Sequence, residues 1–252
     1  MTIKSPHPDK MLRMDMHPAS WEHPLPSPVI RYAEDLWAVL ADPACECTGP
    51  VYHMYRGVNS SPEDRRWMEE QQIRFDITVI PPRELCGEFI KTKGHYHPDD
   101  PDGAGYPEIY EVLAGEAHYL IQTRDCSDIV MISARAGDVV VVPSGYGHVT
   151  INPSRDSVLE MANLVSSRFS SDYLGYESRH GAAYFEMADG EFVKNPAYPE
   201  HTTLRLVRAQ RLSDVSDAIP DPLYDLVRKR DPLLEFLNYP EKHEALFRDL
   251  YP

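Results

Sequence analysis

The sequence predicts an all-β protein of the sandwich or barrel type. From about residue 51 to residue 198, short apolar or alternating segments are separated by turns rich in Gly, Pro, Asp and Asn. The length of 252 residues is ample for one well-buried core with extensions on either side. The expected strands are 51–56, 73–80, 88–97, 108–113, 117–122, 129–133, 139–142, 148–152 and 159–165, followed by a hairpin of 183–187 and 191–193 that turns at Asp189-Gly190.

The two ends of the chain differ in character from this central part. Residues 1–48 are rich in Pro and Met, and 27–40 is expected to be a helix whose apolar face includes Ile30, Leu36 and Val39. After Pro199 the chain is charged, and short helices are expected at 220–230 and 231–251. We therefore expect an N-terminal extension (1–48) packed on the barrel, a β-domain (49–198) and a helical C-terminal extension (199–252).

Composition limits the class of partner. Twenty-five Lys and Arg stand against 40 Asp and Glu, which gives a formal charge of −15. Such a field repels nucleic acid and anionic membranes, so an anionic substrate must be held by a local group of donors. The N-terminus lacks the apolar core of a signal peptide, and no stretch is apolar enough to span a bilayer. The expected location is cytoplasmic.

The four cysteines, Cys45, Cys47, Cys86 and Cys126, are few and irregularly spaced. This spacing does not suggest a disulfide framework. Cys45 and Cys47 resemble half of a zinc site, but no second Cys/His pair has matching spacing. They are therefore expected to be structural or incidental thiols.

A metal site is predicted from two segments. Alternate side chains of a strand share a face, so His95 and His97 point the same way and Tyr96 points away. Glu108 begins the next strand, with Tyr110 on the same face. Three histidines and one carboxylate form the ligand set of a mononuclear divalent-metal site once His148 is included.

His148 belongs to the second of these segments. Gly137-Asp138 leads into four valines, and the turn at Pro143 and Gly145 delivers His148 to the start of the following strand. A single histidine on a strand is more often a core or surface residue than a ligand. Four residues that all fall at ligand positions are much harder to explain in that way.

These segments resemble the two cupin motifs. In the first motif, Glu108 is separated from Gly115 by six residues, as in the family. In the second, Gly137, Pro143, Gly145, His148 and Asn152 fit every position. One departure is the ten-residue gap between His97 and Glu108, which we interpret as a surface loop (98–107) at the barrel mouth. The resemblance implies a cupin double-stranded β-helix, or jelly-roll barrel, with peripheral helices at both termini.

A narrower resemblance covers about residues 50–198. The segments 74–82, 92–97, 107–116 and 145–152 are similar to the cupin-type, or archaeal-type, glucose-6-phosphate isomerases. The resemblance implies a homodimer and the following roles: metal ligands His95, His97, Glu108 and His148; phosphate binding by Thr78, Thr92 and Gly94; sugar-pocket tyrosines Tyr110 and Tyr173. Val165 and Ser171 depart from the family pattern and leave the substrate preference open.

The chemistry fits this resemblance. Aldose–ketose isomerisation needs a Lewis acid at O1 and O2 and a group that moves a proton between C1 and C2. Glu108 is the expected base and Tyr110 lies beside it, although a metal-assisted hydride transfer is the rival mechanism. Fe²⁺ is the expected ion, with Mn²⁺, Ni²⁺ or Zn²⁺ as alternatives. Lys93 is a possible charge partner for the phosphate, and a bulge is expected near Lys93-Gly94.

Three functions are therefore compatible with the sequence. The preferred one is a metal-dependent isomerase of glucose 6-phosphate and fructose 6-phosphate. The others are another metal-dependent cupin enzyme (a dioxygenase or a different sugar-phosphate isomerase) and a non-enzymatic sugar-binding cupin. Thr78 and Thr92 favour the first, because a dioxygenase has no need of a phosphate-binding group.

Overall fold

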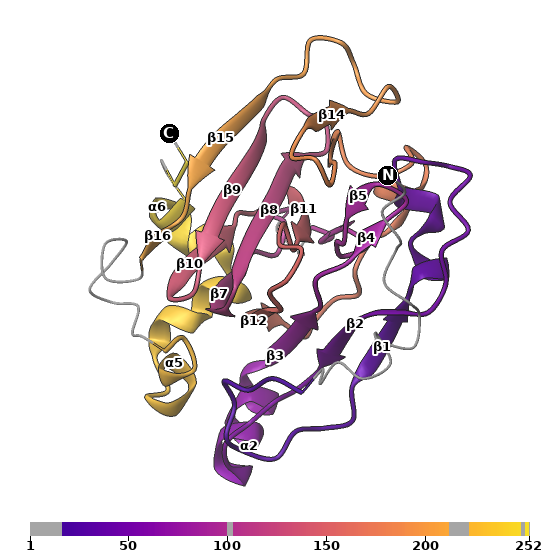
Figure 1. The fold of residues 1–252 in the computed structure, drawn as a ribbon. Helices are drawn as coiled ribbons and strands as arrows, with labels where there is room; N and C mark the ends of the chain where they lie inside the picture. Colours follow the sequence, from indigo (N-terminus) through magenta and orange to yellow (C-terminus); the bar gives the residue numbers. More distant parts are fainter. Residues whose placement is uncertain (1–16, 100–102, 212–221, 248–249, 252) are drawn as a thin grey trace.

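The protein is built from two β-sheets that face each other (Figure 1). The computed structural model describes residues 17–99, 103–211, 222–247 and 250–251. The larger sheet has the order β1 (Val29–Tyr32), β2 (Pro50–Tyr55), β3 (Ile73–Ile80), β12 (Leu159–Ser166), β7 (Glu108–Ala114), β10 (Asp138–Val142) and β16 (Gln210–Arg211). The smaller sheet has the order β15 (Leu204–Arg208), β9 (Ile129–Arg135), β8 (Glu116–Thr123), β11 (Tyr146–Ile151) and β6 (His95–Tyr96).

Short hairpins and helices surround these sheets. The hairpins are β4 (Glu84–Leu85) with β5 (Glu88–Phe89), and β13 (Tyr184–Glu186) with β14 (Phe192–Lys194). The α-helices are α2 (Pro62–Gln71), α3 (Leu174–Glu177), α5 (Asp225–Arg228) and α6 (Glu244–Phe247), and the 3-10 helices are η1 (Ala33–Asp35), η2 (Trp37–Val39), η3 (Pro232–Leu237) and η4 (Pro240–His243). Among the described residues, no helix is long and apolar enough to cross a membrane. The two facing sheets, with short helices outside them, confirm the predicted all-β jelly-roll fold.

The strand β3 shows why both faces of the larger sheet are buried. Its residues alternate, so Phe75, Ile77 and Val79 face away from the smaller sheet while Arg74, Asp76 and Thr78 face toward it. The outward residues pack in one apolar cluster with Leu226 and Leu237 of the C-terminal region. A second cluster fills the space between the sheets. The C-terminal helices therefore serve as a cover for the outer face.

Several local expectations are wrong. The predicted helix at 27–40 is the edge strand β1 followed by η1 and η2, because Val29–Tyr32 pairs antiparallel with β2. The C-terminal region also contains a strand, β15, which pairs parallel with β9. Helix α2, capped by Ser61, was not predicted. The division at residues 48 and 198 stays a prediction, since both flanking segments contribute strands to the sheets.

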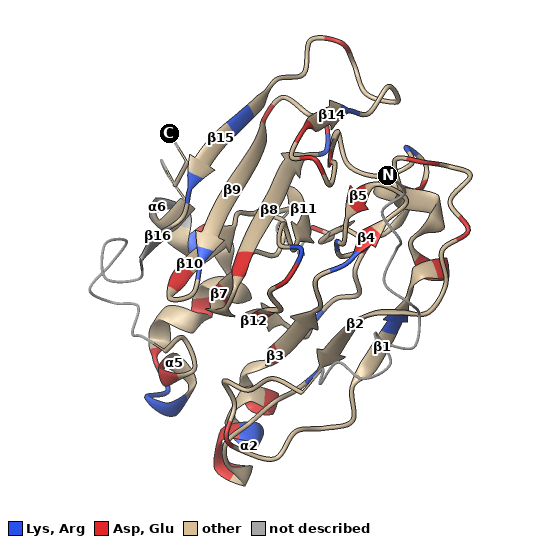
Figure 2. Cartoon of the chain, in the orientation of Figure 1, with Lys and Arg blue, Asp and Glu red and all other residues tan. Residues whose placement is uncertain are grey.

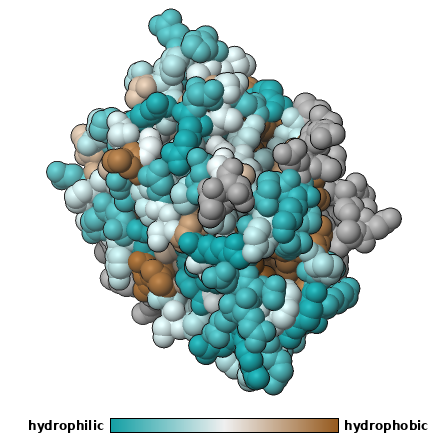
Figure 3. Space-filling view, turned by 180° about the vertical axis from the view of Figure 1, so that it is seen from behind, coloured by the Kyte–Doolittle hydropathy of each residue, from teal (hydrophilic) through white to brown (hydrophobic). Residues whose placement is uncertain are grey.

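Charged residues are spread over many elements rather than collected in one (Figure 2). Hydrophilic residues cover most of the face seen in Figure 3, with hydrophobic residues in a few separate patches. This distribution is the usual one for a protein whose large apolar side chains are used in its core.

The cysteine prediction is also wrong, because Cys45 forms a disulfide with Cys86. The bond joins the segment after η2 to the turn between β4 and β5. Sequence spacing did not reveal this pair, since the two cysteines are 41 residues apart and meet only in the folded chain. Cys47 and Cys126 are free thiols, and the Cys47 sulfur lies 3.2 Å from that of Cys45.

Reduction of the disulfide is expected to destabilise the protein. Closing a loop of this length removes denatured-state entropy worth ~4 kcal/mol. We expect a clear fall in Tm after treatment with a reductant, and labelling of two thiols per denatured, unreduced chain against four after reduction. Labelling of all four cysteines without reductant would contradict the pairing.

Candidate active site

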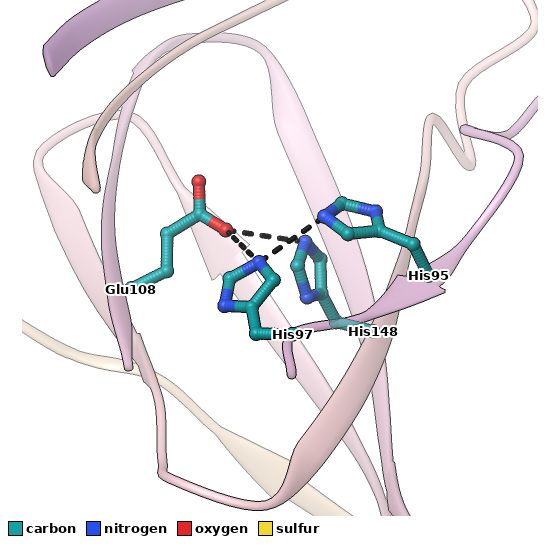
Figure 4. Close-up of side chains that lie close together, drawn as sticks. All are labelled: His95, His97, Glu108 and His148. Carbon is teal, nitrogen blue, oxygen red and sulfur yellow. Dashed lines mark hydrogen bonds and ion pairs between the residues drawn. The ribbon is translucent and has the colours of Figure 1, made fainter. Parts of the chain in front are cut away.

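Four donor side chains meet between the two sheets (Figure 4). His95 and His97 come from β6 and the residue after it, His148 from β11, and Glu108 from the start of β7. Pairing of β6 with β11 puts His95 directly opposite His148. The predicted ligands therefore converge because of strand register, although they span 54 residues of sequence.

The donor atoms are spaced as ligands of one ion. His95 Nε2 and His97 Nε2 are 3.1 Å apart, and Glu108 Oε2 lies 3.3 Å from His97 Nε2 and 3.4 Å from His148 Nε2. An ion with ligand bonds of about 2.1 Å holds neighbouring donors about 3.0 Å apart in octahedral geometry and about 3.4 Å apart in tetrahedral geometry. The four residues could therefore hold a divalent metal.

Neighbouring groups fix the orientation of these donors. His97 Nδ1 donates to the carbonyl of Tyr106 at 2.8 Å, which leaves Nε2 free to bind a cation. Asn163 Nδ2 donates to Glu108 Oε1 at 2.6 Å, so the second oxygen, Oε2, is turned toward the histidines. His148 Nδ1 is buried and has no hydrogen-bond partner among the described residues.

Burial and charge keep the site in a metal-binding protonation state. Burial lowers the pKa of His95 well below its usual value, and it lowers the pKa of His148 to about 4. Burial acts to raise the pKa of Glu108, but the His97 hydrogen bond and the attraction of His148 outweigh it, so the pKa is lowered. At neutral pH the imidazoles of His95 and His148 are neutral and the Glu108 carboxylate is ionised, which is the form that binds a cation.

Tyr110 lies beside this group. Its hydroxyl is 3.0 Å from His148 Nε2, and burial followed by the charge of Glu108 raises the pKa of Tyr110 well above its usual value. The side chain is therefore a neutral phenol that can donate a proton in a hydrogen bond. Tyr173, the other predicted tyrosine, has its ring 5.5 Å from that of His95.

The segment before His95 departs from regular strand geometry, as expected. Gly94 has a φ of +78°, and a Cβ there would lie 2.6 Å from Val149 Cγ2, so only glycine fits without a shift. Thr92 Oγ1 accepts a hydrogen bond from the Thr150 backbone at 2.9 Å, and Lys93 forms an ion pair of 2.6 Å with Glu177. The kink lets residues on both sides of Gly94 line one pocket, which also contains the four donor side chains.

All the predicted substrate residues line this pocket: Thr78, Thr92, Lys93, Gly94, Tyr110 and Tyr173. Val165 and Ser171 line it too. Residues 100–102 of the predicted mouth loop lie outside the described residues, but Tyr106 of that loop is buried.

The pocket is basic although the chain is acidic. Among the described residues, its lining contains the cations Arg31, Arg56, Arg74 and Lys93 and one acidic residue, Glu108. The motifs did not reveal these arginines or Asn163. Two signals for them were present in the sequence: the alternation of Arg74, Asp76 and Thr78 on one strand, and the polar Asn163 between apolar neighbours at the centre of another strand. Local positive charge is what an anionic substrate of this acidic protein requires.

A two-sheet β-roll with three histidines and a glutamate on its inner face defines a cupin with a candidate mononuclear metal site. The sequence profile of the family described as glucose-6-phosphate isomerase (GPI) matches residues 30–202. The chain belongs to this family, whose named members are aldose–ketose isomerases.

Individual relatives agree with this assignment. The chain is 31% identical over 134 residues to the glucose-6-phosphate isomerase of Thermococcus kodakarensis, covering 52% of this chain and 68% of that protein. It is 36% identical over 84 residues to that of Pyrococcus furiosus, covering 33% of this chain and 42% of the relative. The chain thus matches less than half the length of the second relative.

Solved structures show only distant similarity. A Bacillus subtilis oxalate decarboxylase mutant gives a TM-score of 0.36 at 18% identity, covering 49% of this chain and 28% of the other. A vicilin from Capsicum annuum gives 0.35 at 13% identity, covering 51% and 32%. Similarity at this level carries no information about function.

The metal site is tested by removing single ligands. His97→Ala and His148→Ala are each expected to lose the ion, because each deletes one of the four donors and a nitrogen that faces the Glu108 carboxylate. Metal content of the purified protein should fall from about one ion per chain to far below one. His118→Ala is the matched control, since His118 bonds to Glu186 and lies outside the pocket. Equal metal content in all four proteins would contradict the site.

Proposed function

We propose that the protein is a metal-dependent isomerase that interconverts glucose 6-phosphate and fructose 6-phosphate. The convergence of His95, His97, His148 and Glu108 beside a basic pocket supports the proposal, in a chain that belongs to this isomerase family. A divalent ion bound there would supply a Lewis acid that polarises the sugar carbonyl. Fe²⁺ is the ion we propose, with Mn²⁺, Ni²⁺ and Zn²⁺ as alternatives.

Glu108 is the proposed proton carrier. It is ionised at neutral pH and Asn163 restrains its Oε1, so Asn163 acts as a positioning residue. The carboxylate takes the proton from C2 of open-chain glucose 6-phosphate and returns it to C1, while the proton of the O2 hydroxyl passes to O1, so that the molecular formula is unchanged. Tyr110, the second proposed catalytic residue, is a neutral donor that can hydrogen-bond the sugar oxygen where negative charge develops.

The phosphate is proposed to lie at the side of the pocket formed by Thr78, Thr92, Lys93 and Gly94. We add Arg31 to this proposed group, because its guanidinium carbon is 5.8 Å from the Tyr173 ring centre and Lys93 Nζ is 5.3 Å from the same ring. Lys93 is already paired with Glu177, whereas Arg31 Nε is buried without a hydrogen-bond partner among the described residues, and a bound phosphate would supply an acceptor for it.

A homodimer and a cytoplasmic location belong to this proposal as well. The Cys45–Cys86 disulfide counts against the location, because disulfides are uncommon in reducing compartments.

Activity is tested directly with metal-depleted protein. We expect EDTA-treated protein to lack fructose 6-phosphate conversion, and we expect Fe²⁺, Mn²⁺, Ni²⁺ or Zn²⁺ to restore it. The measurement is a coupled assay of glucose 6-phosphate, with the His118→Ala variant as a control for handling. Absence of conversion with every ion would refute the isomerase and leave a sugar-binding cupin as the alternative.

The role of Glu108 is tested by solvent isotope exchange. A proton that passes through a carboxylate exchanges with water, so the reaction in D₂O should place deuterium at C1 of fructose 6-phosphate. NMR of the product at low conversion measures this incorporation. Product without deuterium would contradict proton transfer and support the hydride shift.

A further inference from the structure

A second basic group faces the pocket, formed by Arg56 and Arg74 around Asp76. Arg56 Nη1 donates to Asp76 Oδ2 at 2.5 Å, and Arg74 Nε donates to both carboxylate oxygens at 2.8 Å. Asp76 is fully buried and also accepts from the Gly57 backbone at 2.9 Å. One buried carboxylate therefore holds two guanidinium groups in fixed orientations.

These arginines keep unused hydrogen-bonding capacity. Within the part of the chain that the structure describes, the terminal nitrogens of Arg74 have no hydrogen-bond partner. The side chains of Arg56 and Arg74 are 40% and 36% exposed. The two guanidinium groups share the charge of Asp76, and Glu108 also attracts Arg56, so Arg74 is the less neutralised of the two cations. A guanidinium group that is partly exposed and has free terminal nitrogens is suited to bind a carboxylate or a phosphate.

The group is separate from the one proposed to hold the sugar phosphate. Arg31 pairs across β1 and β2 with Tyr52, whereas Arg56 lies four residues farther along the chain than Tyr52. Four residues of extended chain span about 13 Å. The two basic groups therefore lie at different positions along the larger sheet, although both line the same pocket.

Strand register relates the second group to the metal ligands. Arg74 on β3 is opposite Val165 on β12, and Val165 is opposite Glu108 on β7. Two strand spacings place the backbones of Arg74 and Glu108 about 10 Å apart, within the combined reach of an arginine and a ligand. The pocket wall between Arg74 and Glu108 carries Val165. Ser166 and Ser171 also line the pocket. All three side chains are small, so they leave room for a ligand between Arg74 and Glu108.

We propose that Arg56 and Arg74 form a second anion subsite, which selects sugar phosphates that carry another acidic group at the end opposite the phosphate. The ligand class is a phosphorylated sugar acid or a sugar bisphosphate. This inference rests on the proposed function, because that function places the first phosphate near Lys93. With that phosphate in place, the far end of the sugar lies near Glu108 and within reach of Arg74.

The test compares the binding of three ligands to the metal-loaded full chain by calorimetry: fructose 6-phosphate, fructose 1,6-bisphosphate and 6-phosphogluconate. At least one ligand with two acidic groups is expected to bind about tenfold more tightly than fructose 6-phosphate, the effect of one added charge-assisted hydrogen bond. Preference for the bisphosphate indicates a phosphate in the subsite, and preference for 6-phosphogluconate indicates a carboxylate. Arg74→Met should remove the preference.

Three further variants make the result specific. Arg56→Met should act like Arg74→Met and replaces it if that variant does not fold. Lys93→Met should weaken all three ligands alike, because it acts on the shared phosphate. Arg135→Met, at an exposed position on β9, is the matched control and should change none of them.

Defined outcomes would overturn the subsite. These are equal affinity of wild-type protein for all three ligands, or a preference that survives both Arg56→Met and Arg74→Met. Failure of the proposed function has a different signature: fructose 6-phosphate does not bind and Lys93→Met has no effect. A preference for two acidic groups that is lost in Arg74→Met would sustain the subsite even then.

Discussion

The antiparallel pairing of β6 with β11 is the constraint on which the site depends. It sets His95 opposite His148, and the alternation of side chains then turns His97 to the same face as His95. Glu108 comes from the facing sheet, so the candidate metal position bridges the two layers. A buried carboxylate is costly unless an opposite charge lies beside it, and Asn163, which donates to Glu108, is uncharged. A divalent cation at this point would compensate the charge and join the two sheets.

The same inner face explains how an acidic protein can recognise an anion. Side chains alternate along β3, so the apolar ones pack in the cluster on the outer face of the larger sheet and the polar ones lie on the pocket side. The C-terminal helices cover the outer face, which allows the strand to be buried on both sides. The positive charge of the pocket is thus a consequence of strand alternation combined with that cover, and it is independent of the net charge of −15.

The fold and the four candidate metal-ligand positions were accessible from sequence because they depend on short-range patterns. His95 and His97 lie at the end of one expected strand and Glu108 at the start of the next, and His148 follows a turn with recognisable Gly and Pro positions. Arg31 and Cys86 were not accessible, because each acquires its role through a contact with a distant segment. The region 27–40 was mistaken for a helix since its apolar spacing fits a helix, whereas pairing with β2 decides its conformation.

The most direct test of the central claim is anomalous diffraction from crystals of the metal-loaded protein at the absorption edge of the added ion. We expect one strong peak per chain, about 2.0–2.2 Å from the Nε2 atoms of His95, His97 and His148 and from a carboxylate oxygen of Glu108. A peak elsewhere, for example at the Cys45, Cys47 and Cys86 sulfurs, or four side chains without a shared peak, would contradict it.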